Sequence, residues 1–273
     1  RLLVSVYLAA VTISAAYTFY VGLNGHSNVI RQTAYGVYDS RFPLTYGGFD
    51  FIYGLVVVYV ILLQVLLNGK GQIKKSVKTT IIILLILFAL TIIVSGFSTA
   101  FALIFVVTVF IAPKKTSSKV ALLGIFIFFV FVIPIPLTKF IESLPFMPKL
   151  TSKRISDLIL SFSGQGTSAY LTEDGQRFDR TLWTLQAFSS HPFFGVYGAS
   201  SNAALGYHTE WLDQMARYGI FATIFNTSFW IVTYQRIKRH IIPGTITYKC
   251  FRSACRVIFS VGSLNPIFMA VTT

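Results

Sequence analysis

Residues 79–95 read TTIIILLILFALTIIVS, a run that contains no charged side chain. A hydrocarbon layer about 30 Å thick is crossed by roughly 17 to 25 residues of α-helix. The run is continuously apolar, whereas a strand of a membrane barrel alternates polar and apolar residues. This stretch therefore predicts a transmembrane helix and, with it, an all-α integral membrane protein.

Further runs of the same character account for much of a composition that is 54% hydrophobic, with a mean hydropathy of +0.69. The seven predicted spans are Leu2 to Val21, Phe51 to Leu67, Thr79 to Ser95, Ser98 to Ala112, Val120 to Thr138, Tyr218 to Tyr234 and Val257 to Thr273. The chain begins without Met at the edge of one span and ends within another. We therefore expect a fragment of a larger polytopic protein.

These spans divide the chain into three predicted parts. Residues 1–138 form a bundle of five spans, residues 139–217 form one large loop, and residues 218–273 hold two spans joined by a basic loop. The large loop holds most of the acidic residues of an otherwise apolar chain. Long loops of this kind are usually functional, so we predict that the working site lies there.

The basic residues predict the orientation, because Lys and Arg accumulate in short cytoplasmic loops. One set of connections carries Arg1, Lys70, Lys74, Lys75, Lys78, Lys114, Lys115, Lys119, Arg236, Lys238, Arg239, Lys249, Arg252 and Arg256. All nine acids lie in the opposite set, so the net charge of +14 sits on one face. We expect that face to be cytoplasmic and the large loop to be extracytoplasmic. Topology and anionic lipid then explain a pI near 9.9, and nucleic-acid binding is not expected.

A helix is predicted over residues 177–190 of the large loop. Asp174 can cap its start, its apolar residues fall on one stripe, and the chain should leave the helix before Pro192. His191 is interpreted as structural, and Trp183 and Trp211 as interfacial anchors. Cys250 and Cys255 fall in the predicted cytoplasmic loop, where thiols stay reduced, and we expect both to be inert.

Arg177 and Arg180 lie three residues apart in the first turn of this predicted helix, so they share a side. They add two cations to the partial positive charge of the helix N-terminus, an arrangement that costs stability unless an anion binds. A diphosphate on a lipid carrier is the obvious anion at a membrane surface. The alternative is that both side chains pair with Asp174 and Asp179 or extend toward lipid head groups.

His208 opens a predicted helix that continues directly into the span at Tyr218. The helix dipole disfavours protonated histidine at that end, which suits a neutral imidazole acting as a general base. The alternative is a packing or interfacial histidine. The possible supporting residues, which can pair with one another, are Glu210, Asp213 and Arg217.

Taken in order, these segments resemble the O-antigen ligase and O-antigen polymerase family of bacterial polytopic membrane glycosyltransferases. Members of that family have a long external loop with a Gly-x-Arg entry, a second Arg before an aromatic-rich helix, a Pro-aromatic-Gly-Val turn, and a His that leads into a span. The matching segments are Gly175-Gln-Arg177, Arg180-Thr-Leu-Trp183, Pro192-Phe-Phe-Gly-Val196 and His208 to Ile220.

The resemblance implies an inverting glycosyltransferase of the bacterial cytoplasmic (inner) membrane that needs no metal or other cofactor. Its donor would be a glycan on undecaprenyl diphosphate. Arg177 and Arg180 would hold the diphosphate, and His208 would activate the acceptor hydroxyl. Many members also carry an Arg in a short outer hairpin. This chain has Ser95-Gly-Phe-Ser-Thr99 there, so either another cation substitutes, with Arg31 and Arg41 as the candidates, or the donor is bound differently.

Two acceptors are compatible with the same motifs. A polymerase for O-antigen, capsular or other surface polysaccharide extends a second lipid-linked glycan, and this reading is favoured. A ligase would instead transfer the glycan to lipid A core, as in lipopolysaccharide, or to protein or wall polymer. From other classes, a lipid-glycan flippase is disfavoured because the spans carry almost no charge. A metal-dependent transferase using Asp39 or Asp50 is a further alternative.

Overall fold

The computed structural model describes residues 2–24, 26, 29–30, 48–69, 71, 73–111, 120–121, 124, 134–144, 149, 152–153, 156, 182–196 and 210–264. Every regular element within these ranges is helical. The chain forms two compact units, Arg1–Gly166 and Thr167–Thr273. The boundary between the units divides the predicted loop of residues 139–217, so that its first part belongs with the first unit.

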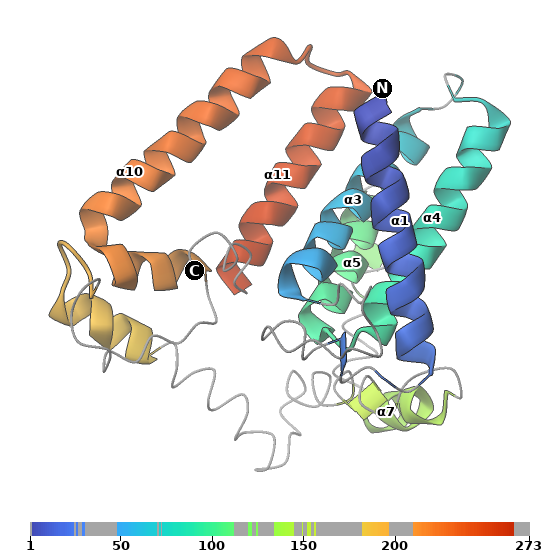
Figure 1. The fold of residues 1–273 in the computed structure, drawn as a ribbon, viewed down its shortest axis with the longest axis horizontal. Helices are drawn as coiled ribbons and strands as arrows, with labels where there is room; N and C mark the ends of the chain where they lie inside the picture. Colours follow the sequence, from blue (N-terminus) through green and yellow to red (C-terminus); the bar gives the residue numbers. More distant parts are fainter. Residues whose placement is uncertain are drawn as a thin grey trace. The chain divides into compact units, whose positions relative to one another are not determined.

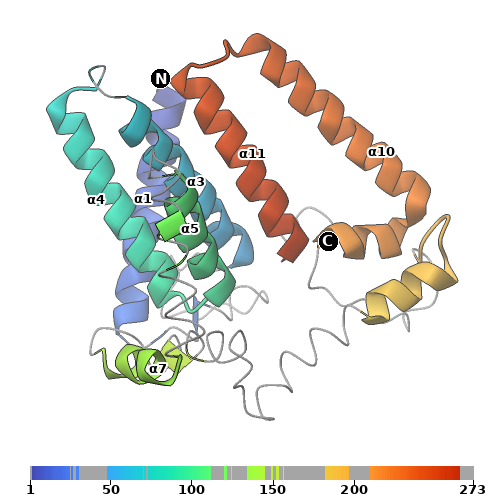
Figure 2. The ribbon, with the colours of Figure 1, turned by 180° about the vertical axis from the view of Figure 1, so that it is seen from behind.

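The first unit is a helix bundle (Figure 1). Its helices are α1 (Leu2–Leu23), α3 (Phe49–Asn68), α4 (Lys75–Val94), α5 (Ser98–Ile111) and α7 (Pro134–Ser143). Helix α4 packs against α1, α3 and α5, and α3 also packs against α5. The short helix α7 lies across the end of the bundle at which α1 ends and α5 begins (Figures 1 and 2).

Small residues bring α1 and α4 close together. Ala15, Thr18 and Gly22 lie on one side of α1 and are buried. The Thr91 hydroxyl of α4 donates to the Ala15 carbonyl at 3.1 Å. At Gly22 an added Cβ would collide with Cγ1 of Val94. Close backbone approach through small residues is the usual way in which membrane helices gain packing contacts, since lipid supplies no hydrophobic drive between them.

Three helices of the described residues are long and apolar enough to cross a membrane, and they agree with three of the predicted spans: Leu2–Leu23, Phe51–Asn68 and Lys75–Val94. This supports a membrane protein with an all-helical fold. Helix α5 has 14 residues, and most of the predicted span at 120–138 lies outside the described residues. Helices α10 and α11 of the second unit are long enough but less apolar.

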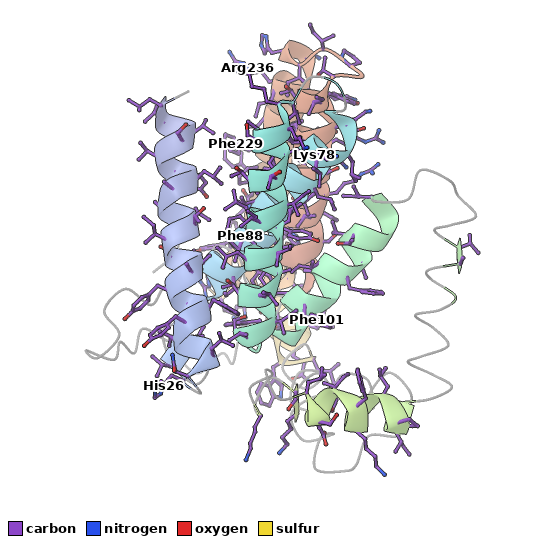
Figure 3. All side chains as sticks on the ribbon, turned by 90° about the vertical axis from the view of Figure 1, so that its right-hand side faces the viewer. His26, Lys78, Phe88, Phe101, Phe229 and Arg236 are labelled. Carbon is purple, nitrogen blue, oxygen red and sulfur yellow. The ribbon has the colours of Figure 1, made fainter. Side chains whose placement is uncertain are left out.

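The two ends of the bundle differ in their ionisable residues. His26 and Lys78 lie at opposite ends (Figure 3). At the end of α1 the His26 amide donates to the Val21 carbonyl at 3.2 Å. Ile30, a few residues further on, is fully buried. This separation is what the sequence predicts for connections on opposite membrane faces. Which compartment each end meets stays a prediction.

The second unit contains a helix at residues 182–190, a turn at residues 191–196, α10 (Glu210–His240) and α11 (Ile246–Leu264). Tyr234 and Phe251 stack with ring centroids 5.4 Å apart, near the short connection between α10 and α11. The sequence predicted a basic loop from residue 235 to residue 256. The structure instead extends both helices into it, so that only residues 241–245 connect them.

The contact at Gly22 predicts a difference between two helical glycines. Gly22→Ala places a methyl group against Val94, whereas Gly54 of α3 has open space around it. Overpacking costs about 1–3 kcal/mol, and Ala in place of Gly in a helix gains up to about 1 kcal/mol. We therefore expect Gly22→Ala to lower the midpoint of thermal unfolding in detergent and the control Gly54→Ala to leave it unchanged or raise it. Equal shifts in the two variants would contradict the α1–α4 contact.

Candidate functional site

The helix at residues 182–190 ends before Pro192, as the sequence predicts. The residue before a proline is pushed out of the helical region, and proline supplies no backbone N–H. The His191 amide donates to the carbonyls of Ala187 and Phe188, at 3.2 and 3.1 Å, which closes the last helical turn. The Gly195 amide then donates to the His191 carbonyl at 2.9 Å, and the chain reverses.

Helix α10 is interrupted at Gly219, where φ is 80° and ψ is 179°. The sequence predicted a helix that runs directly into a span at Tyr218. The structure breaks it one residue later, because glycine alone adopts this backbone conformation without steric cost. The break redirects residues 210–218, so that Trp211 stacks on Phe259 of α11 with ring centroids 5.9 Å apart.

The turn and the break exchange backbone hydrogen bonds. In an uninterrupted helix the Ile220 amide would donate to the Ala216 carbonyl, four residues earlier. Here the Ile220 amide donates to the Pro192 carbonyl at 2.8 Å, and the Ala216 carbonyl accepts from the Val196 amide at 3.0 Å. Both groups released by the break are therefore satisfied by the turn. We call this contact, between residues 191–196 and residues 216–221, the junction.

Two glycines make the junction possible. Gly195 and Gly219 both have positive φ, of 69° and 80°. A Cβ on Gly195 would collide with the backbone at Arg217, and a Cβ on Gly219 would collide with the backbone at Phe193. The segments that meet also share a pattern, an aromatic residue followed by Gly and a β-branched residue. These are Phe194-Gly195-Val196 and Tyr218-Gly219-Ile220.

A buried polar contact lies beside the junction. The Thr184 hydroxyl donates to Oδ1 of Asp213 at 3.0 Å. Thr184 is 1% exposed and Asp213 is 7% exposed. Hydrogen bonds to a carboxylate are stronger than those between neutral groups. The contact therefore ties the helix at 182–190 to the first turns of α10, and Asp213 faces that helix.

The other predicted supporting residues are placed as follows. The guanidinium of Arg217 lies 6.0 Å from the ring centroid of Tyr218. Trp211, interpreted from the sequence as an interfacial anchor, donates its indole N–H to the Phe259 carbonyl at 3.2 Å. This hydrogen bond holds α10 to α11. Glu210 is the first residue of α10, and its side chain lies outside what the structure describes.

The remaining predicted site residues lie outside the described residues. They are Arg31, Arg41, Arg177, Arg180 and His208, together with Asp39 of the alternative metal site. Their roles stay predictions. Among the residues that the structure does describe, no group of three or more His, Cys, Asp or Glu side chains is placed to hold a metal ion.

Cys250 and Cys255 lie on α11, and neither forms a disulfide. Burial raises the pKa of both thiols, because it penalises the charged thiolate. The thiolate is the reactive form, so a raised pKa lowers reactivity near neutral pH. This direction is in keeping with the expectation that both cysteines are inert.

The junction predicts that alanine will destabilise the protein more at Gly195 and Gly219 than at Gly244. Gly195→Ala and Gly219→Ala should each cost about 3 kcal/mol or more, since positive φ costs about 1–2 kcal/mol and each lost hydrogen bond about 1 kcal/mol. Gly244 has a φ of 84° but open space around it, so Gly244→Ala should cost only the backbone strain. Chemical unfolding in detergent, followed by tryptophan fluorescence, measures all three. If Gly244→Ala costs as much as the other two variants, the junction is not the cause of their instability.

The two segments of the junction are also two of the segments that carry the resemblance to the O-antigen ligase and polymerase family. No protein-family model, curated protein or solved structure matches the chain. The resemblance to that family therefore rests on sequence segments alone.

Proposed function

We propose that this chain is a membrane glycosyltransferase that polymerises glycans carried on undecaprenyl diphosphate at the outer face of the bacterial cytoplasmic membrane. The proposal includes seven membrane spans and an extracytoplasmic loop at residues 139–217. The three apolar helices of the first unit support the membrane setting. The ordered motifs between Gly175 and Ile220 support the activity.

One observation carries the proposal furthest. The Thr184–Asp213 hydrogen bond joins the two segments that lead to the proposed reactive residues. In the sequence, Arg180 precedes Thr184 by four residues and His208 precedes Asp213 by five. A chain spans at most about 3.3–3.6 Å per residue. A diphosphate held by the first segment and a base on the second can therefore serve one substrate.

The proposed reaction is a single displacement at the anomeric carbon. His208 takes the proton of the acceptor hydroxyl, and the hydroxyl oxygen forms the new glycosidic bond. The bond between the anomeric carbon and the diphosphate oxygen breaks at the same centre, and the configuration is inverted. Arg177 and Arg180 neutralise the negative charge that builds on the departing diphosphate, which is where fixed cations lower a barrier most.

The described spans offer little support for the alternative of a flippase. Transporters place ionisable groups or broken helices near the midplane of the bilayer. The candidate spans Leu2–Leu23 and Phe51–Asn68 contain no charged residue, and Lys75–Val94 contains Lys75 and Lys78 near its start. The interior of these spans carries none, and the break in α10 at Gly219 lies at the start of the predicted span Tyr218 to Tyr234 rather than near its middle. Both points favour a site in the loop rather than along a transport path.

The proposed roles predict a loss of long polysaccharide chains in two variants. His208→Ala should lower the rate of transfer about 10²–10⁴-fold, the usual worth of a general base, and Arg177→Ala should also shorten the surface-polysaccharide ladder. His191→Ala is the matched control, because the hydrogen bonds that His191 makes with the described residues come from its backbone. The measurement compares ladders in a strain that lacks its own copy, at equal membrane abundance. Normal ladders with His208→Ala would remove the general-base assignment.

The acceptor distinguishes polymerase from ligase. Purified protein in vesicles, supplied only with undecaprenyl-diphosphate-linked repeat units, should yield carrier-linked chains longer than one repeat. His208→Ala serves as the inactive control. If product forms only when lipid A core, a protein or a wall polymer is added, the protein is a ligase. Movement of labelled lipid-linked glycan across the vesicle membrane that His208→Ala leaves intact would favour the flippase.

A further inference from the structure

Three phenylalanine rings gather on the surface of the junction. Phe221 stacks on Phe193 with ring centroids 5.9 Å apart and lies 5.8 Å from Phe194. Their side chains are 59% (Phe193), 78% (Phe194) and 56% (Phe221) exposed. We call these three residues the aromatic cluster. Large aromatic side chains held this far out of a core mark a surface that meets something other than water.

Backbone hydrogen bonds hold together the two segments that carry the aromatic cluster. The Ile220 amide bonds to the Pro192 carbonyl on one side of the cluster, and the Val196 amide bonds to the Ala216 carbonyl on the other. Gly195 lies against the backbone at Arg217, and Gly219 lies against the backbone at Phe193, so the backbones that carry the rings are held close together. In this arrangement all three rings stay more than half exposed.

The cluster is continuous with a second apolar surface. From the break onward α10 exposes a series of large hydrophobic side chains, namely Ile220, Phe221, Ile224, Phe225, Phe229, Trp230, Ile231 and Val232. No charged residue occurs between Tyr218 and Gln235, and none between Leu182 and Val196. Before the break, α10 carries Glu210, Asp213 and Arg217. The cluster thus sits where a polar helix gives way to an apolar one.

We propose that the aromatic cluster inserts into the interface of a lipid bilayer and anchors the turn at residues 191–196 there. Aromatic side chains are favoured at the boundary between lipid head groups and acyl chains. Arg217 is the one charged residue of the junction, and the runs Leu182 to Val196 and Tyr218 to Gln235 carry no Lys or Arg, which favours the acyl region over anionic head groups as the partner. Anchoring the turn also anchors α10 at its break, because the turn is hydrogen-bonded to the backbone groups freed at Gly219.

Depth can be measured directly on the whole chain. A nitroxide spin label is attached to Phe194→Cys in a background with Cys250→Ser and Cys255→Ser, and the protein is reconstituted in phosphatidylcholine vesicles. Collision of the label with oxygen, which partitions into hydrocarbon, is compared with collision with a water-soluble nickel chelate. Ile242→Cys is the matched control, since Ile242 is 73% exposed but lies in the turn between the basic residues Arg239 and Lys249.

We expect the label at position 194 to collide more with oxygen than with nickel, and the label at position 242 to show the reverse. Gly219→Ala should move the label at position 194 toward the aqueous pattern. Preferential collision with nickel at position 194 would overturn the proposal. Protection from both reagents would also overturn it, and would indicate that protein covers the cluster. Hydrocarbon exposure that requires phosphatidylglycerol would show electrostatic capture instead of apolar insertion.

This inference rests on the membrane setting of the chain and not on glycan transfer. His208→Ala is expected to leave the depth of the label at position 194 unchanged, even though it stops the proposed reaction. Failure of the transfer reaction and failure of the insertion are therefore seen in separate measurements.

Discussion

The second unit depends on one constraint: a helix that breaks must find partners for the backbone groups it releases. Each unsatisfied group costs several kcal/mol where water is excluded. At Gly219 the released pair is the Ile220 amide and the Ala216 carbonyl, and the turn at residues 191–196 supplies a partner for each. The redirected start of α10 then reaches both Phe259 of α11 and Thr184.

Both units use a missing side chain to bring backbones together, but for different reasons. At Gly22 the absence of Cβ lets α1 approach α4, and both helices keep their own hydrogen bonds. At Gly195 and Gly219 the missing side chains let two segments trade hydrogen bonds. The first contact gains packing, whereas the second prevents the loss of backbone hydrogen bonding. A substitution in the bundle therefore loosens a contact, and one in the junction leaves polar groups unpaired.

The sequence predicted well the features that depend on local composition. The span at Thr79–Ser95 and the end of the helix before Pro192 follow from apolar length and from proline geometry. It did not predict the break, because a lone glycine in a helical pattern signals only a cost of about 1 kcal/mol. The shared pattern of an aromatic residue, Gly and a β-branched residue at Gly195 and Gly219 could have pointed to the contact between them, but it is seen only when the two segments are compared with each other. The start of α11 was missed because Lys249, Arg252 and Arg256 were counted as loop charges, although their spacing suits one helical face.

The buried Thr184–Asp213 contact gives Asp213 a structural role in the proposed glycosyltransferase. In the proposed reaction the leaving diphosphate and the attacking hydroxyl must be held on opposite sides of one carbon, and a misplacement of about 1 Å costs about 10²-fold in rate. Asp213 is almost fully buried and turned toward Thr184. Its carboxylate thus helps to fix the distance between two segments, which makes it a positioning residue in the proposed mechanism. The segment that follows Arg180 and the segment that follows His208 are therefore joined at two places, by the Thr184–Asp213 hydrogen bond and by the backbone hydrogen bonds of the junction.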